Sequence, residues 1–161
     1  MHSMILGLLH PFHGGDHLLA MLAVGFWGAR YPGSLRWLLP ASFVGGTAAG
    51  AFLWAPLPYV EPMIALSVLV IGLAVAMRAR LPAAAGAAVV FAFAVFHGHA
   101  HIEELAAGVS ASLFMSGLLA TTAVLHVAGV YVALGVGRVS AALPRALGAA
   151  TALAGAWLLL A

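Results

Sequence analysis

The sequence predicts an all-α membrane protein: a single polytopic bundle of six transmembrane helices that takes up residues 1–161. Hydrophobic residues make up 65% of the chain and charged residues 6%, whereas soluble domains have roughly 45–50% apolar and 25% charged residues. A chain of 161 residues cannot hide so much apolar surface in its own core, so lipid must cover the remainder. Because the few arginines form no basic face, a nucleic-acid partner is not expected.

Six apolar segments follow one another, and arginine, proline or an acidic residue bounds each. Each segment has the roughly 20 residues that about 30 Å of hydrocarbon requires. Turn signals fill the short connections, and no linker or second domain fits between them. The predicted spans are about 4–29 before Arg30, 36–55 before Pro56, 61–78 from Glu61 to Arg78, 82–100 from Pro82, 105–136 between Glu104 and Arg138, and 142–160 after Arg138.

The arginines predict the orientation of this bundle. They flank only the first, third and fifth connections, whereas Glu61, Glu103 and Glu104 lie in the second and fourth. Positive residues stay on the cytoplasmic side of a membrane. We therefore expect a multi-pass protein of the bacterial inner membrane with both termini on the outer, periplasmic side. The arginines are Arg30, Arg36, Arg78, Arg80, Arg138 and Arg145.

Two polar clusters lie in the outer half of this predicted bundle. In a continuous helix, His10, His13 and His17 fall within one arc beside Asp16. In the fourth span, residues 97, 101 and 104 (His, His and Glu) have the spacing i, i+4, i+7 and share one face. Ionisable groups are costly in lipid and mark ion sites or pathways. Two histidines four residues apart beside a carboxylate suit Zn²⁺, Ni²⁺ or Co²⁺.

Four further residues could each have more than one role. His13, His99 and Glu103 are assigned to the pathway or to the support of the ligands, and His99 points away from the shared face if the helix continues past it. His126 lies deeper in the membrane than the others, and it acts either as a hydrogen-bonding group between helices or as an inner relay.

The motifs resemble those of the HupE/UreJ family of nickel/cobalt permeases. Residues 10–17 read HPFHGGDH, which is similar to the family signature H-P-F-x-G-x-D-H. Residues 96–104 read FHGHAHIEE and resemble a second signature, F-H-G-x-A-H-G-x-E, with Ile102 in place of glycine. The stretch from Glu61 to Ser67 and the stretch around His126 resemble two further family motifs.

This resemblance implies a permease, not an enzyme, that imports Ni²⁺ for metalloenzymes such as hydrogenase or urease. The ion is its cargo, with Co²⁺ or Zn²⁺ as alternatives, and no catalytic cofactor is expected. The start Met1-His2 is similar to that of the membrane component of energy-coupled importers, where the second residue binds metal. The implied metal-binding residues are His2, His10, Asp16, His17, Glu61, His97, His101 and Glu104.

The sequence is also compatible with two other functions. One is a membrane-embedded zinc hydrolase, in which histidines and a carboxylate hold a metal-activated water. The other is a haem cytochrome with histidines on facing helices as its two axial ligands. Against the hydrolase, no serine lies within either signature, and the site offers more ligands than an open catalytic zinc needs. Haem does not need Asp16, Glu61 and Glu104 in the same layer.

Overall fold

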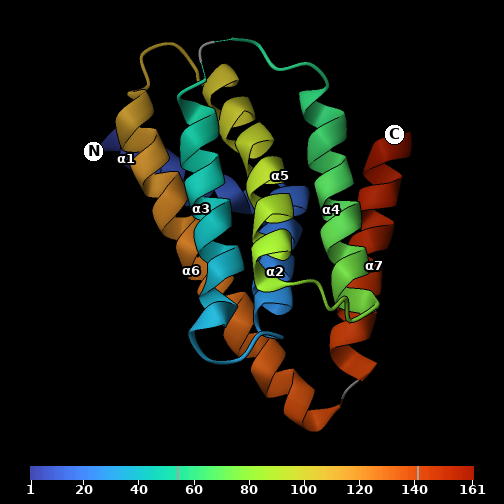
Figure 1. Ribbon diagram of the computed structural model, residues 1–161. Coiled ribbons are helices and arrows are strands. Elements are labelled where there is room, and N and C mark those ends of the chain that lie inside the picture. Colours follow the sequence, from blue (N-terminus) through green and yellow to red (C-terminus); the bar gives the residue numbers. More distant parts are fainter. Residues whose placement is uncertain (54, 141) are drawn as a thin grey trace.

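The computed structural model in Figure 1 describes residues 1–53, 55–140 and 142–161, and the side chain of Asp16 lies outside that description. The described residues form helices and no strand, which confirms the all-α class. Two short 3-10 segments are η1 (His10–Phe12) and η2 (Gly33–Trp37). The α-helices are α1 (His2–Leu9), α2 (Gly15–Gly28), α3 (Leu38–Ala51), α4 (Val60–Ala76), α5 (Ala83–Glu103), α6 (Ala111–Val139) and α7 (Ala142–Leu160).

Three of the described helices, α5, α6 and α7, are long and apolar enough to cross a membrane. Residues His17–Gly28 and Val60–Ala76 form shorter apolar helices. α3 has 14 residues, so it is about 21 Å long at 1.5 Å per residue, and η2 precedes it. The chain is therefore an integral membrane protein whose helices differ in length more than the predicted spans do.

The first predicted span is not one helix, and this expectation was wrong. α1 ends at Leu9, η1 makes one tight turn, and α2 begins at Gly15. Pro11 supplies no backbone N–H to continue the α-helical ladder. Gly14 then adopts an extended backbone with φ −116° and ψ 115°. The two ends of the first polar motif thus lie on different helical pieces, and the shared arc predicted for them does not exist.

Neighbouring helices pack at very close range through glycines. The most extensive packing joins α3 to α5 and α4 to α7, and α6 packs on both α1 and α2. On α3, a Cβ added at Gly46 or Gly50 would collide with the backbone of α5 at Phe91 or Val95. At Gly15, by contrast, no described neighbouring atom lies within 4 Å of the Cβ position. The close contacts lie in the regular helices and not at the break in the first span.

The main apolar core surrounds α2. Met21, Val24 and Trp27 of α2 are buried in the same cluster as Leu39 and Phe43 of α3. These core residues of α2 all follow its first turn. The first turn itself places His17 against the rings of His97 and His101 on α5.

The two ends of the bundle differ in charge. Figure 1 shows the α3–α4 and α5–α6 connections at the same end as both termini, and the α2–α3, α4–α5 and α6–α7 connections at the opposite end. The glutamates at positions 61, 103 and 104 therefore lie at the first end and the arginines at the second. The predicted separation of the two charges holds for the ends of the bundle.

The α4–α7 contact gives a test of this packing. We expect Gly155→Ala to lower the free energy of unfolding by about 1–3 kcal/mol, because its Cβ would meet the backbone of Leu69. Gly135→Ala in α6 is the matched control: it has open space around it and should gain about 0.5–1 kcal/mol from helix propensity. Thermal unfolding in one detergent measures both, and equal shifts would contradict the packing.

Candidate metal centre

Four imidazole rings form a continuous row between the broken first span and α5. The centroids of His97 and His17 are 5.4 Å apart, and those of His17 and His101 are 4.7 Å apart. The row ends at His10, whose centroid lies 4.6 Å from that of His101 and 6.0 Å from that of His17. The structure thus brings together four histidines that the sequence places some 80 residues apart.

The break in the first span positions the two N-terminal rings. His10 is the first residue of η1, and the ring of Phe114 from α6 packs against it at 5.3 Å between centroids. His17 lies in the first turn of α2. Because the chain turns between these two residues, both rings reach α5 from separate pieces of backbone.

α5 supplies the other two rings from one buried face. His97 and His101 are one helical turn apart, and each is 1% exposed. α5 continues to Glu103, so Ile102 stands in regular helix where the family signature has glycine. The expected common face of His97 and His101 is therefore present.

A hydrogen bond to α4 fixes the tautomer of His97. The Ser67 hydroxyl donates to the carbonyl of Ile64 at 2.6 Å, and Ser67 Oγ lies 2.9 Å from His97 Nε2. Because the single hydroxyl hydrogen of Ser67 is donated to Ile64, Ser67 Oγ accepts the hydrogen bond and Nε2–H of His97 donates it. The lone pair then lies on Nδ1 of His97. Such a partner orients a histidine for metal ligation.

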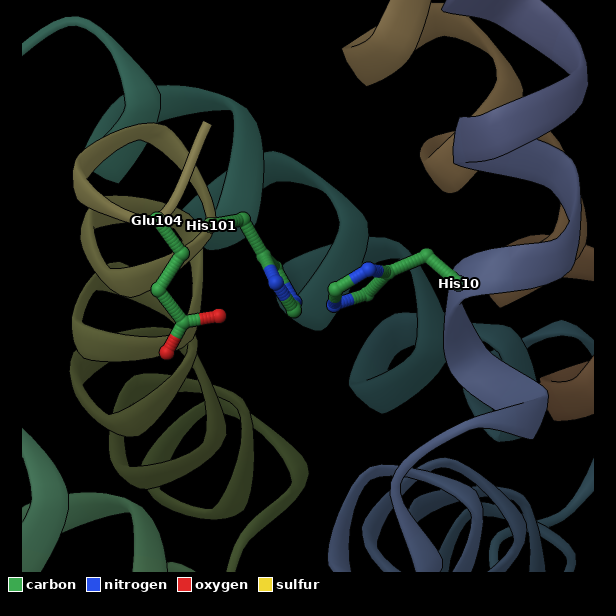
Figure 2. Close-up of side chains that lie close together, drawn as sticks. All are labelled: His10, His101 and Glu104. Carbon is green, nitrogen blue, oxygen red and sulfur yellow. The ribbon is translucent and has the colours of Figure 1, made fainter. Parts of the chain in front are cut away.

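Glu104 adds a carboxylate to the end of the row. His10, His101 and Glu104 each place one ligand atom within 4.8 Å of the other two. Figure 2 shows the rings of His10 and His101 pointing toward one another, with the Glu104 carboxylate on the His101 side. Ligands of a tetrahedral ion at about 2.0–2.1 Å lie about 3.4 Å from one another. A side-chain movement of about 1 Å therefore brings these three groups to ligating distance.

Carboxylates also line an open hollow beside this group. The hollow has a volume of about 400 Å³ and lies between the start of α4 and the end of α5. Glu61, Glu103 and Glu104 all contribute to it, and all three are exposed. Glu104 thus belongs both to the hollow and to the group with His10 and His101. Glu61 lines the hollow but is not part of that group.

Other predicted residues lie elsewhere. His2 is exposed at the start of α1, eight residues or about 12 Å of helix before His10. His13 is exposed at the end of η1. His99 is buried and turned toward the α3–α4 connection, where its Nε2 accepts a hydrogen bond from Leu57 N–H at 3.2 Å and lies 3.2 Å from Glu103. The predicted role of the Asp16 side chain concerns a group outside the described part of the chain.

His126 lies in α6 and shares an aromatic neighbour, Phe43, with His97 of the row. Its Nδ1–H donates to the carbonyl of Met21 at 2.7 Å, which is the interhelical bond expected of a structural histidine. The ring of Phe43 lies 5.2 Å from that of His97 and 5.0 Å from that of His126. Ser67 and Phe43 were not predicted to lie at the site. A single hydroxyl residue within an apolar helix was the feature of the sequence that could have indicated Ser67.

The donors suit a divalent cation better than a haem. Imidazole nitrogen and carboxylate oxygen together bind Ni²⁺, Co²⁺ and Zn²⁺. Haem needs its axial imidazoles on opposite faces of a macrocycle. The ring centroids of His10 and His101 are only 4.6 Å apart, and those of His17 and His97 only 5.4 Å apart. Neither pair leaves room for a porphyrin.

Comparisons with known proteins agree with the motifs. The family described as "HupE / UreJ protein" matches residues 1–158. Among curated proteins, the chain is 45% identical over 157 residues to "Protein HupE" of Rhizobium leguminosarum bv. viciae, which covers 95% of this chain and 82% of that protein. No solved structure matches.

The Ser67–His97 contact can be tested without metal. We expect Ser67→Ala to lower the free energy of unfolding by about 1–3 kcal/mol, because a buried ring N–H then loses its acceptor. Ser116→Ala is the control, since the exposed Ser116 hydroxyl bonds only within α6, to the carbonyl of Ser112 at 2.8 Å. Equal unfolding midpoints for the two variants would show that Ser67 does not hold His97.

Proposed function

This chain belongs to the HupE/UreJ family, and from that premise we propose that it is a nickel permease. It imports Ni²⁺, with Co²⁺ or Zn²⁺ as alternative cargo, through the bacterial inner membrane to supply metalloenzymes such as hydrogenase or urease. The observation that carries the proposal is the row of four imidazoles that ends beside the Glu104 carboxylate. The family implies the ion, and the residues supply ligands of the kind that this ion prefers.

Entry begins at the hollow lined by Glu61, Glu103 and Glu104. Three carboxylates in one exposed hollow raise the local concentration of divalent cations. Glu104 belongs to both the hollow and the ligand group, so it passes the ion from water to His10 and His101. In this step the ion exchanges water molecules for imidazole nitrogens, and a carboxylate offsets part of its charge.

Inward movement then follows the row of imidazoles. His17 contacts both His101 and His97, so it links the outer pair to the deepest ring. Phe43 closes the way from His97 toward His126 and must move before an ion passes. Because metal ligation requires imidazoles without a proton at the ligating nitrogen, acidification releases the ion. Proton entry from either side is therefore able to drive release.

Transport fits these residues better than catalysis. A catalytic zinc keeps three protein ligands and an open position for water, whereas this row offers four imidazoles and a carboxylate along a path. We propose that the hydrolase reading fails for this reason.

We further propose that the bundle crosses the membrane six times, with both termini outside. In this arrangement α1, η1 and α2 cross together as the first span. The end that carries the glutamates faces the periplasm, where the ion enters, and the arginine end faces the cytoplasm.

Nickel uptake tests the permease proposal. Cells that produce His101→Ala or Glu104→Gln should take up radioactive nickel at least tenfold more slowly than cells with the unaltered protein, at equal amounts of protein in the membrane. Each change removes a ligand of the outer group. Ser34→Ala, an exposed change in η2 at the arginine end, should leave uptake unaltered. Uptake by His101→Ala at the unaltered rate would refute the proposal.

Cysteine labelling tests the orientation, since the chain has no cysteine of its own. Ser34→Cys lies in η2 at the arginine end, and Ala106→Cys lies in the α5–α6 connection; both positions are exposed. In intact spheroplasts, a membrane-impermeant maleimide should label only residue 106, and both residues should react after the membrane is opened. Labelling of residue 34 in intact spheroplasts would reverse the orientation.

A further inference from the structure

We propose that the arginine end of the bundle binds an anionic phospholipid, with its phosphate between Arg30, Arg78 and Arg145 and an acyl chain in the adjoining apolar groove. This site lies at the opposite end from the metal centre. It does not depend on which ion the protein carries.

A cavity of about 260 Å³ forms the headgroup part of the site. It lies between the ends of α2, α4 and α6 and the start of α7. Three of its lining residues are the arginines named above, and no acidic residue is among the residues that line it. Basic pockets between transmembrane helices on the cytoplasmic side are typical sites for phospholipid headgroups.

The charges in this cavity lack a counterion within the described protein. Arg30 follows the last turn of α2, and burial, together with the nearby positive charges of Arg78 and Arg80, lowers its pKa. Its Nε is buried and has no hydrogen-bond partner among the described residues. A phosphate accepts bonds from several guanidinium groups at once, so it would relieve this mutual repulsion.

The backbone of Arg78 supports a functional role for its side chain. Residue 78 has a φ of +55°, a left-handed conformation that favours glycine. It follows the end of α4, where Arg78 N–H bonds to the carbonyl of Val75 at 3.1 Å and Ala79 N–H to that of Ala74 at 2.8 Å. This is the hydrogen-bond pattern of a helix end that normally takes glycine. The strain is consistent with a need for the guanidinium at this place.

An apolar groove continues from the cavity toward the middle of the bundle. It also has a volume of about 260 Å³, shares Phe26 and Val75 with the cavity, and runs along α2 to Leu19. Seven residues of helix separate Leu19 from Phe26, which corresponds to about 10 Å. Val132 of α6 and Leu147 of α7 line its other side. Free phosphate would fill the cavity alone, whereas a phospholipid fills both.

The full-length protein in neutral detergent allows a direct test by native mass spectrometry and thermal unfolding. The probes are phosphatidylglycerol, phosphatidylcholine with the same acyl chains, and inorganic phosphate. We expect phosphatidylglycerol to bind and to raise the unfolding midpoint, and the other two to have much smaller effects. Loss of each arginine should weaken phosphatidylglycerol binding about fivefold.

The variants separate charge from folding. Arg30→Gln with Arg145→Gln should bind phosphatidylglycerol about 25-fold more weakly. Arg78→Gly removes a charge and the backbone strain together, so it should lose affinity without a lower midpoint in lipid-free detergent. Arg36→Gln is the control, since Arg36 lies at the same end but its Nε bonds to the carbonyl of Gly33 at 2.9 Å, outside the cavity.

Three results would overturn the proposal. The first is equal binding of phosphatidylcholine and phosphatidylglycerol. The second is unchanged phosphatidylglycerol affinity in Arg78→Gly, which keeps the test decisive even if the double variant does not fold. The third is stabilisation by inorganic phosphate equal to that by phosphatidylglycerol, which would assign the cavity to a free anion.

Discussion

The cost of placing imidazoles among apolar helices governs the rest of this structure. His97 and His101 are almost fully buried, and a polar ring in such a place must meet hydrogen-bonding groups or a cation. Ser67 from α4 meets His97, and the Glu104 carboxylate closes the other end of the row. Helices α2, α4 and α5 are thereby joined around one layer. A divalent cation is the ligand that this mixture of nitrogen and oxygen donors binds in common.

The broken first span makes the row possible. In a straight helix, His10 and His17 would lie two turns apart, about 10 Å along the axis. The turn at η1 and the extended backbone at Gly14 instead let both rings reach His101. The candidate metal centre thus lies at the break in the first span, and the buried core around Trp27 holds the rest of α2 in place.

The sequence predicts the helical class, the apolar segments and the shared face of His97 and His101, because these follow from composition and from helical periodicity. It does not predict where the first span breaks, since Pro11 and two glycines permit several backbone paths. The contact of His17 with His97 and the bond from His97 to Ser67 depend on how α2, α4 and α5 pack. Glycines such as Gly50 allow the close helix contacts that determine this packing. A glycine in the sequence does not indicate which helix will pack against it. His99 departs from the shared face as its spacing indicates, yet its bond to Leu57 depends on a loop.

The two ends of the bundle differ in charge, with glutamates beside the candidate metal centre and arginines at the far end. The first of these ends carries the candidate metal centre. Crystals of the protein loaded with Ni²⁺, measured at the nickel absorption edge, test it most directly. The expected result is an anomalous peak between His10, His101 and Glu104. A peak only among Glu61 and Glu103 at the surface, or at the N-terminus, would contradict the assignment of this row as the site that receives the ion.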